Sequence, residues 1–136
     1  MRIISGTMRG TKLFTLEGEN TRPTLDRVKE ALFSKINYDL PDAVVLDLFA
    51  GSGGLGIEAL SRGAAHALFI EKDSRAFQVL QENIKKCRYE DVSERFRVDA
   101  TRAVKALLKR DIEVDYLFVD PPYHKKEYYD LVEVLV

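Results

Sequence analysis

The sequence predicts an α/β protein with a doubly wound, mainly parallel sheet, and two observations carry this prediction. From residue 43 onward, short apolar runs alternate with stretches whose apolar residues recur at helical spacing, which is typical of strand–helix–strand units. The first run ends at Asp47 and is followed by a loop with four glycines and an apolar helical pattern through Leu60. Because strand–helix–strand crossovers are right-handed, such units place helices on both faces of one sheet.

The 136 residues are enough for one domain, whose parts follow in order. Residues 1–16 read as a β-hairpin around a turn marked by Gly6 and Gly10. Residues 21–38 predict a helix with Thr24 as its cap. Arg27, Lys29 and Glu30 are expected to lie off the apolar face of this helix. The predicted apolar face of this helix is Leu25, Val28, Leu32, Phe33 and Ile36. Residues 43–136 predict the core, with strands at 44–47, 67–71, 96–98 and 115–120 and helices at 55–62, 73–87, 103–109 and from about 126.

Composition excludes several classes of protein. The 46% apolar and 32% charged content is that of a soluble globular chain. No apolar run approaches the roughly 20 residues of a membrane helix, and the first residues do not form a secretory signal. The single cysteine, Cys87, excludes an internal disulfide and is expected to be a buried helix residue, while His66 and His124 make a poor metal set. We therefore expect a cytoplasmic protein without a metal site or a membrane anchor.

Charge is unevenly distributed, although the net charge is only −1. Residues 1–16 contain Arg2, Arg9 and Lys12 and no acidic residue. Such a patch suits contact with phosphate. An ordinary solvated hairpin is the alternative.

Four carboxylates mark the predicted strand ends: Asp47, Glu71, Asp99 and Asp120. Ligands of doubly wound sheets bind at the carboxyl ends of the strands, so these residues predict the site. Gly51, Gly53 and Gly56 match the pattern G-x-G-x-x-G, which is shared by sites for NAD, FAD and S-adenosylmethionine. Glu71 at the end of the next strand is placed to accept hydrogen bonds from ribose hydroxyls. Together they indicate a cofactor that contains adenosine.

The sequence Asp120-Pro-Pro-Tyr123 narrows the chemistry. The carboxylate of Asp120 and the carbonyl of Pro121 can each accept a hydrogen bond from one N–H group of an exocyclic amine, which directs the nitrogen lone pair at a methyl donor. The prolines, Pro121 and Pro122, fix these acceptors in advance, and Tyr123 offers a face on which a base can stack. This arrangement favours amine methylation over hydride transfer.

The segments VLDLFAGSGGLGIEALSRGA, FIEKD, VDA and FVDPPY, in this order and spacing, resemble class I S-adenosylmethionine-dependent methyltransferases of the amino-group type. The segments RIISGTMRGTKL and TRPTLDRVKEALF resemble the RsmD family, bacterial enzymes that methylate the N2 amine of a guanine in 16S ribosomal RNA. The resemblance implies a Rossmann-like class I methyltransferase fold, S-adenosylmethionine as cofactor, and 16S rRNA in the small ribosomal subunit or its assembly intermediate as partner.

The resemblance also implies roles for individual residues. The catalytic amine pocket would be formed by Asp120, Pro121, Pro122 and Tyr123, and the RNA contact by Arg2, Arg9 and Lys12. Asp47, Ala50, Gly51, Ser52 and Gly53 would hold the methionyl portion of the cofactor, Glu71 its ribose, and Asp99, with Ala100 beside it, the adenine amine. Phe49 and Lys72 are also expected to bind the cofactor, and Arg22 and Thr24 to lie beside cofactor and substrate. Helix entry is the alternative role for Arg22 and Thr24, and helix capping is the alternative role for Asp99.

One departure from the family pattern concerns the end of the chain. Members of the family continue for several strands after this motif, whereas this sequence ends at Val136, so we expect a truncated chain without its C-terminal strands. Three alternatives remain open at this point: a DNA adenine-N6 or cytosine-N4 methyltransferase, an NAD-dependent dehydrogenase, and a non-catalytic RNA-binding fragment.

Overall fold

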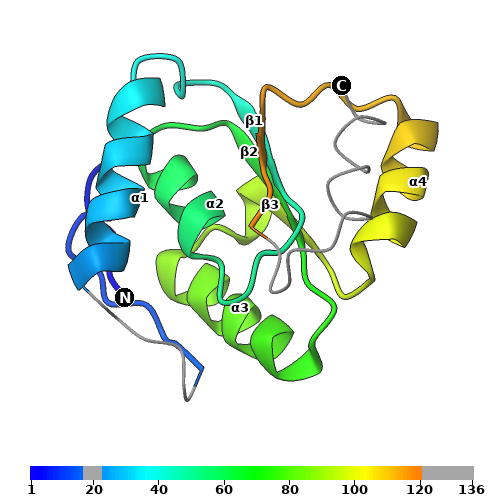
Figure 1. The fold of residues 1–136 in the computed structure, drawn as a ribbon, viewed down its shortest axis with the longest axis horizontal. Helices are drawn as coiled ribbons and strands as arrows, with labels where there is room; N and C mark the ends of the chain where they lie inside the picture. Colours follow the sequence, from blue (N-terminus) through cyan, green and yellow to red (C-terminus); the bar gives the residue numbers. More distant parts are fainter. Residues whose placement is uncertain (17–22, 121–136) are drawn as a thin grey trace.

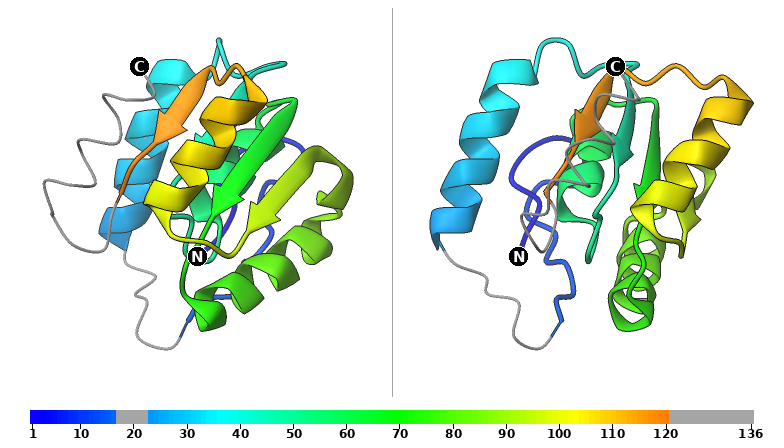
Figure 2. Two further views of the ribbon diagram at one scale, coloured as in Figure 1. Left: turned by 90° about the vertical axis from the view of Figure 1, so that its right-hand side faces the viewer. Right: turned by 45° about the vertical axis from the view of Figure 1, so that its right-hand side comes forward.

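The computed structural model describes residues 1–16 and 23–120, and of residues 23–26 it describes only the backbone. Within this part, four parallel strands stand in the order β3-β2-β1-β4 (Figures 1 and 2). The strands are β1 (Val44–Asp47), β2 (His66–Ile70), β3 (Ser93–Phe96) and β4 (Tyr116–Phe118), and the helices are α1 (Pro23–Ile36), α2 (Gly54–Ser61), α3 (Ser74–Cys87), the 3₁₀ turn η1 (Glu90–Val92) and α4 (Ala100–Arg110). The predicted doubly wound parallel sheet is confirmed.

Two apolar clusters sandwich the sheet. Alternate strand residues face opposite sides, as a period of two requires. One cluster joins Val45 and Phe69 to side chains of α1, α2, α3 and the N-terminal segment. The other joins Leu46 and Leu68 to Val104 of α4. Figure 1 shows α4 on one side of the strands and the other three helices on the opposite side.

The third strand begins earlier than predicted, at Ser93 instead of residue 96. Its sequence SERF has no apolar alternation, because β3 is the edge of the sheet and its polar side chains find partners outside the core. Glu94 accepts a hydrogen bond from Arg110 at 3.1 Å and shares one with His66 at 2.9 Å. His66 of β2 and Arg110 of α4 therefore both hold Glu94 at the edge of the sheet.

The predicted apolar face of α1 is correct for Phe33 and Ile36, which pack in the core, and wrong for Val28 and Leu32. Val28 is 62% exposed and Leu32 is 37% exposed, whereas Lys29 and Phe33 are buried. The helix is rotated toward Lys29 because a buried carboxylate on α2 pairs with its ammonium group. Pro23 is the first helical residue, a position that proline favours, so Thr24 lies inside the helix and not at its cap.

Residues 1–16 form a reduced version of the predicted hairpin. Its two arms are joined by one antiparallel bridge between Arg2 and Lys12, without regular strands. Gly6 has φ 93° and lies so close to α2 that an added Cβ would stand 1.9 Å from the carbonyl oxygen of Ser61. The hairpin is therefore seated on α2 and is part of the folded domain.

Cys87 lies buried at the end of α3 and is free, as predicted. Burial raises the pKa of its thiol. Within the described residues, no helix has the length and apolar character needed to cross a membrane, and no group of three metal-ligating side chains is brought together.

Candidate cofactor and substrate site

The four predicted carboxylates lie at one edge of the sheet. Asp47 is the last residue of β1, Glu71 follows β2 directly, and Asp120 follows β4 after one intervening residue. Asp99 stands beyond β3 as the N-cap of α4. Because all strands are parallel, as their arrows in Figure 2 show, these positions share the carboxyl edge of the sheet.

Asp47 is the most unusual group of this edge. Its side chain is 1% exposed, and its Oδ1 accepts a hydrogen bond from the Phe49 N–H at 3.2 Å. Its Oδ2 has no hydrogen-bond partner in the described part of the chain. Burial, with smaller effects of Glu71 and Asp120, raises the pKa of Asp47 to about 7. A buried oxygen without a hydrogen-bond partner lowers the stability of the folded state. Asp47 can therefore bind a ligand that donates hydrogen bonds or carries positive charge.

The glycine loop joins β1 to α2 through two left-handed residues, Gly51 at φ 56° and Gly53 at φ 95°. Gly53 is the N-cap of α2, and a Cβ there would stand 2.6 Å from Leu80 of α3. A Cβ on Gly56 would stand 2.3 Å from the ring of Phe69. These glycines therefore permit both the turn and the close packing of α2 on the sheet.

Glu71 fixes the loop from the neighbouring strand. Its Oε1 accepts from the Gly51 N–H at 2.7 Å, and its Oε2 accepts from the Asp73 N–H at 2.8 Å. Each carboxylate oxygen has a second lone pair that can accept a further hydrogen bond. Glu71 can thus hold the loop and still receive hydroxyl groups of a ligand. The next residue, Lys72, is exposed beside it.

Three backbone amides of the loop are not available to a phosphate group. The N–H groups of Ala50, Gly51 and Gly53 are already bonded to Ile70, Glu71 and Ala50 respectively. The surrounding carboxylates make the local potential negative, which is why they raise the pKa of Asp47. This edge therefore suits a cationic ligand better than a pyrophosphate.

At the third strand, Asp99 acts as a helix cap, since its Oδ2 accepts from the Thr101 N–H at 3.1 Å. Ala100 beside it is buried. Asp120 is exposed at the end of the described chain. Pro121, Pro122, Tyr123, Arg22, His124 and the helix expected from about residue 126 lie outside the described residues, as does the side chain of Thr24.

Sequence reasoning missed Asn83, which is 0% exposed on the inner face of α3. Its Nδ2 donates to the Ser52 carbonyl at 2.8 Å and to the Phe14 carbonyl at 3.0 Å, and its Oδ1 accepts from the Phe14 N–H at 2.7 Å. One amide thus joins the cofactor loop to the segment after the hairpin. The signal in the sequence was an asparagine in register with Leu80 and Cys87, where an apolar residue is expected.

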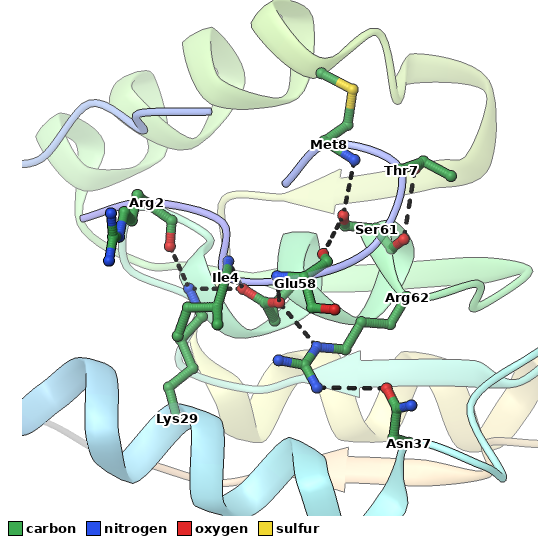
Figure 3. A network of polar contacts seen from close by, with 10 residues as sticks. Arg2, Ile4, Thr7, Met8, Lys29, Asn37, Glu58, Ser61 and Arg62 are labelled. Carbon is green, nitrogen blue, oxygen red and sulfur yellow. Dashed lines mark hydrogen bonds and ion pairs between the residues drawn. The ribbon is translucent and has the colours of Figure 1, made fainter. Parts of the chain in front are cut away.

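Sequence reasoning also missed Glu58, a fully buried carboxylate of α2 (Figure 3). Its Oε1 lies 3.1 Å from Lys29 Nζ and accepts from the Ile4 N–H at 2.9 Å. Its Oε2 accepts from Arg62 Nε at 2.8 Å and from the Ser5 N–H at 3.1 Å. Burial acts to raise the pKa of Glu58, but these donors outweigh it and hold the pKa below its ordinary value. The same helix that leaves the glycine loop therefore holds both the hairpin and α1.

Ser61, one turn further along α2, completes this attachment. Its Oγ donates to the Ser5 carbonyl at 2.7 Å and accepts from the Met8 N–H at 3.0 Å. Its carbonyl accepts from the Thr7 N–H at 2.8 Å. Figure 3 shows Thr7 and Met8 turned toward Ser61.

A hollow of about 430 Å³ lies elsewhere, lined by Asp39, Pro41, Asp42, Ala43, Asp115 and Tyr116. Asp115 and Ala43 precede β4 and β1, so this hollow is at the amino edge of the sheet. It is separate from the carboxylates at the carboxyl edge and plays no part in the candidate site.

The parallel sheet, the glycine loop and the acidic carboxyl edge define a Rossmann-like domain of the class I methyltransferase type. Comparison with known proteins identifies the family. The family described as conserved hypothetical protein 95 matches residues 1–136, and the chain belongs to this family, whose relatives include ribosomal RNA small subunit methyltransferase D. The resemblance stated from the motifs is therefore confirmed.

Curated relatives match most of the chain. Ribosomal RNA small subunit methyltransferase D of Escherichia coli K12 is 41% identical over 125 residues, which cover 92% of this chain and 61% of the relative. Protein YlbH of Bacillus subtilis 168 is 44% identical over 127 residues, which cover 93% of this chain and 69% of the relative. The chain thus spans about three fifths to two thirds of the length of these relatives.

Solved structures agree with the fold. The Escherichia coli protein yhhF superposes with a TM-score of 0.82 at 34% identity and covers 98% of this chain and 72% of its own. The Thermus thermophilus protein TTHA0928 superposes with a TM-score of 0.81 at 26% identity and covers 99% of this chain and 77% of its own.

Proposed function

We propose that the protein transfers a methyl group from S-adenosylmethionine to the N2 amine of a guanine in small-subunit ribosomal RNA. The observation that carries the proposal is the buried Oδ2 of Asp47 beside the glycine loop, which has no hydrogen-bond partner among residues 1–16 and 23–120. Support for the substrate comes from the Escherichia coli relative, which is named ribosomal RNA small subunit methyltransferase D. The expected place of action is the cytoplasm.

The cofactor fits the described residues. Asp47 Oδ2 would accept a hydrogen bond from the ammonium group of the methionyl portion, and that positive charge would return the pKa of Asp47 from about 7 toward its ordinary value. Glu71 has the lone pairs to bind the ribose hydroxyls, and Asp99 would lie near the adenine. Phe49 and the loop 50–53, with Lys72 and Ala100 at their margins, would complete the cofactor contacts, and Arg22 and Thr24 would lie beside them.

The carboxylates and the engaged amides at the carboxyl edge of the sheet favour S-adenosylmethionine over NAD. A dinucleotide brings a pyrophosphate, which needs free amide donors. Here the amides of Ala50, Gly51 and Gly53 are engaged within the protein, and the nearby groups are carboxylates. S-adenosylmethionine has no phosphate and carries positive charge on its sulfonium and ammonium groups.

The cofactor supplies an electrophilic methyl group, and the remaining work is positioning of the amine. Asp120 and the Pro121 carbonyl would accept hydrogen bonds from its two N–H groups and so aim the nitrogen lone pair. Asp120 would also take the proton that the amine releases. Pro122 would keep this corner rigid, and Tyr123 would stack on the guanine. No metal ion is needed for these steps.

The RNA partner would contact the hairpin through Arg2, Arg9 and Lys12, which are all exposed. The substrate would be 16S rRNA in the small subunit or in an intermediate of its assembly. The hairpin is fixed to α2 through Glu58 and Ser61, so RNA held there would have a defined orientation relative to the cofactor loop.

The test is methyl transfer from radiolabelled S-adenosylmethionine to small ribosomal subunits and to duplex DNA, followed by nucleoside analysis. We expect label in N2-methylguanosine of the small-subunit RNA. Label in DNA alone would identify a DNA amine methyltransferase, and binding to subunits without transfer would identify a non-catalytic RNA-binding chain. Calorimetric titration with S-adenosylhomocysteine and NADH tests the cofactor separately, and tighter binding of NADH would overturn the proposal.

A further inference from the structure

The C-terminal turn of α3 lies against the N-terminal hairpin, although the two segments are more than 70 residues apart in the sequence. Lys86 Nζ donates to the Lys12 carbonyl and stands 4.7 Å from the centre of the Phe14 ring. Thr7 Oγ1 and the Tyr89 hydroxyl share a hydrogen bond at 3.2 Å. The two segments therefore form one continuous surface.

This surface is rich in cations, and we define the basic surface as Arg9, Lys12, Lys85, Lys86 and Arg88. All five residues are exposed. None of them forms an ion pair within the described residues, whereas Lys29, Arg62 and Arg110 each pair with a glutamate.

The favourable placement of cations at a helix C-terminus explains part of this arrangement. Lys85 and Lys86 stand in the last turn of α3, where they oppose the helix dipole. That effect does not explain why Arg9 and Lys12 are brought to the same place. They are held there by buried contacts of Ser61 and Asn83, which fix Met8 and Phe14. The fold thus brings cations of two distant segments to one surface.

Arg88 of the basic surface and the neighbouring Phe14 have further features that suit RNA binding. Arg88 has φ 59°, at the helix-ending position where glycine is the favoured residue. Phe14 is 48% exposed, while Asn83 holds both its N–H and its carbonyl group. A large aromatic side chain on a fixed backbone among cations is suited to an unpaired base next to phosphates.

We propose that the basic surface is a second RNA contact, in which Lys85 and Lys86 of α3 and its C-cap Arg88 extend the interface of the hairpin. The inference rests on the proposed function, because RNA is the polyanion that the candidate active site would act on. The 14 residues of α3 span about 20 Å, and the helix begins beside Glu71. RNA bound at the basic surface therefore extends beyond the reacting guanine by several nucleotides.

The test compares two charge-matched double variants. Lys85→Gln with Arg88→Gln removes two exposed cations of the basic surface. Lys105→Gln with Lys109→Gln removes two exposed cations from α4, which covers the opposite face of the sheet (Figure 1). Binding of a small-subunit rRNA fragment is measured by filter retention over a series of KCl concentrations. None of these four residues belongs to the candidate catalytic or cofactor-binding groups.

For the variant of the basic surface, we expect the slope of log affinity against log salt to fall by about 0.7 for each lost phosphate contact, and affinity to fall about tenfold at 0.15 M salt. For the α4 variant, we expect slope and affinity to remain those of the unaltered chain. Equal losses in both variants, or no loss in the first, would overturn the inference. Phe14→Leu should weaken binding to an unpaired loop more than to a duplex, and equal weakening would remove Phe14 from the contact.

Failure of the inference is distinguishable from failure of the proposed function. S-adenosylhomocysteine affinity should be the same in both double variants, since neither touches the carboxyl edge of the sheet. If the unaltered chain methylates the rRNA and the first variant keeps its KM for RNA, the second contact is wrong and the function stands. If the unaltered chain neither binds nor methylates the rRNA, both are wrong.

Discussion

The Nδ2 atom of Asn83 donates a hydrogen bond to the carbonyl of Ser52 at 2.8 Å, and the same side chain holds both backbone polar groups of Phe14. The candidate cofactor loop and the N-terminal segment therefore share one buried amide. Because every hydrogen-bonding group of that amide is used, no change at this position can preserve all of its contacts. The two parts of the site are joined physically, although they lie far apart in the sequence.

Asn83→Leu should destabilise the protein by about 2–4 kcal/mol, because the buried Ser52 carbonyl and both half-buried backbone polar groups of Phe14 lose their partner. Urea unfolding followed by circular dichroism measures this loss. Asn83→Ser, which retains one hydrogen-bonding group, should recover part of it. Unchanged stability in Asn83→Leu would show that water or other groups replace the amide.

The raised pKa of Asp47 predicts that the stability of the protein depends on pH. Its pKa in the folded state is about 7 instead of 3.8, so folding takes up a proton between these values. The free energy of unfolding should therefore fall as pH rises from about 4 to about 7, by roughly 4 kcal/mol at most. Unfolding of the unaltered chain and of Asp47→Asn is compared over this range, and their difference isolates the contribution of Asp47.

At pH 8, Asp47→Asn should be more stable than the unaltered chain without ligand, because it buries no charge. The same variant should bind S-adenosylhomocysteine more weakly. An Asp47→Asn variant that is less stable at pH 8 and binds the ligand normally would show that Oδ2 has a structural partner instead of a ligand.

Glu58→Gln should cost about 3–5 kcal/mol of stability at neutral pH, because it leaves Lys29 and Arg62 beside a neutral group in a buried network. The pKa of Glu58 lies below 4.5 in the folded state, so its contribution is fully present above pH 4.5 and is lost as pH falls through the folded value. The difference between the two proteins should therefore shrink in acid. Val28→Ala, an exposed change on the same helix as Lys29, is the control and should alter stability by less than about 0.5 kcal/mol.

Asp120→Ala should lower turnover by about 10²- to 10³-fold, the usual effect of removing one preorganised hydrogen-bonding group from the reacting centre. Cofactor affinity should change much less than turnover, because Asp120 is exposed beyond β4, whereas the groups proposed to hold the cofactor follow β1 and β2. Single-turnover methyl transfer and calorimetry separate the two effects. Near-normal turnover would exclude Asp120 from the reaction.

Glu71→Ala should have the opposite profile and weaken cofactor binding first. It removes the acceptor for the Gly51 and Asp73 N–H groups and the group proposed to bind the ribose. The cofactor KM should rise more than kcat falls. A pure loss of kcat would indicate that Glu71 acts on the methyl transfer instead of on the ligand.

The carboxyl edge of the sheet was predictable because it follows from local patterns. Strand ends are marked by Asp47 and Glu71, and a parallel sheet brings all such ends to one edge. The loop was equally local, since its glycines lie close together in the sequence. These features required no knowledge of which distant residues meet.

The predictions for α1 and β3 were wrong where a contact with a residue distant in the sequence determines the local structure. The helical pattern of α1 placed Lys29 away from the core, but Glu58 on α2 pairs with it and turns the helix. In β3, Glu94 is supported by His66 and Arg110, so a strand forms without apolar alternation. Periodicity along one segment contains no information on such pairs.

Cys87 gives this chain a natural reporter of local opening. It is the one cysteine in the sequence, it is buried, and its raised pKa keeps the thiol protonated. A maleimide or disulfide reagent should therefore label the folded protein slowly, at a rate set by how often the end of α3 separates from the sheet. Because that end carries the basic surface, slower labelling in the presence of rRNA would record RNA binding without any introduced probe.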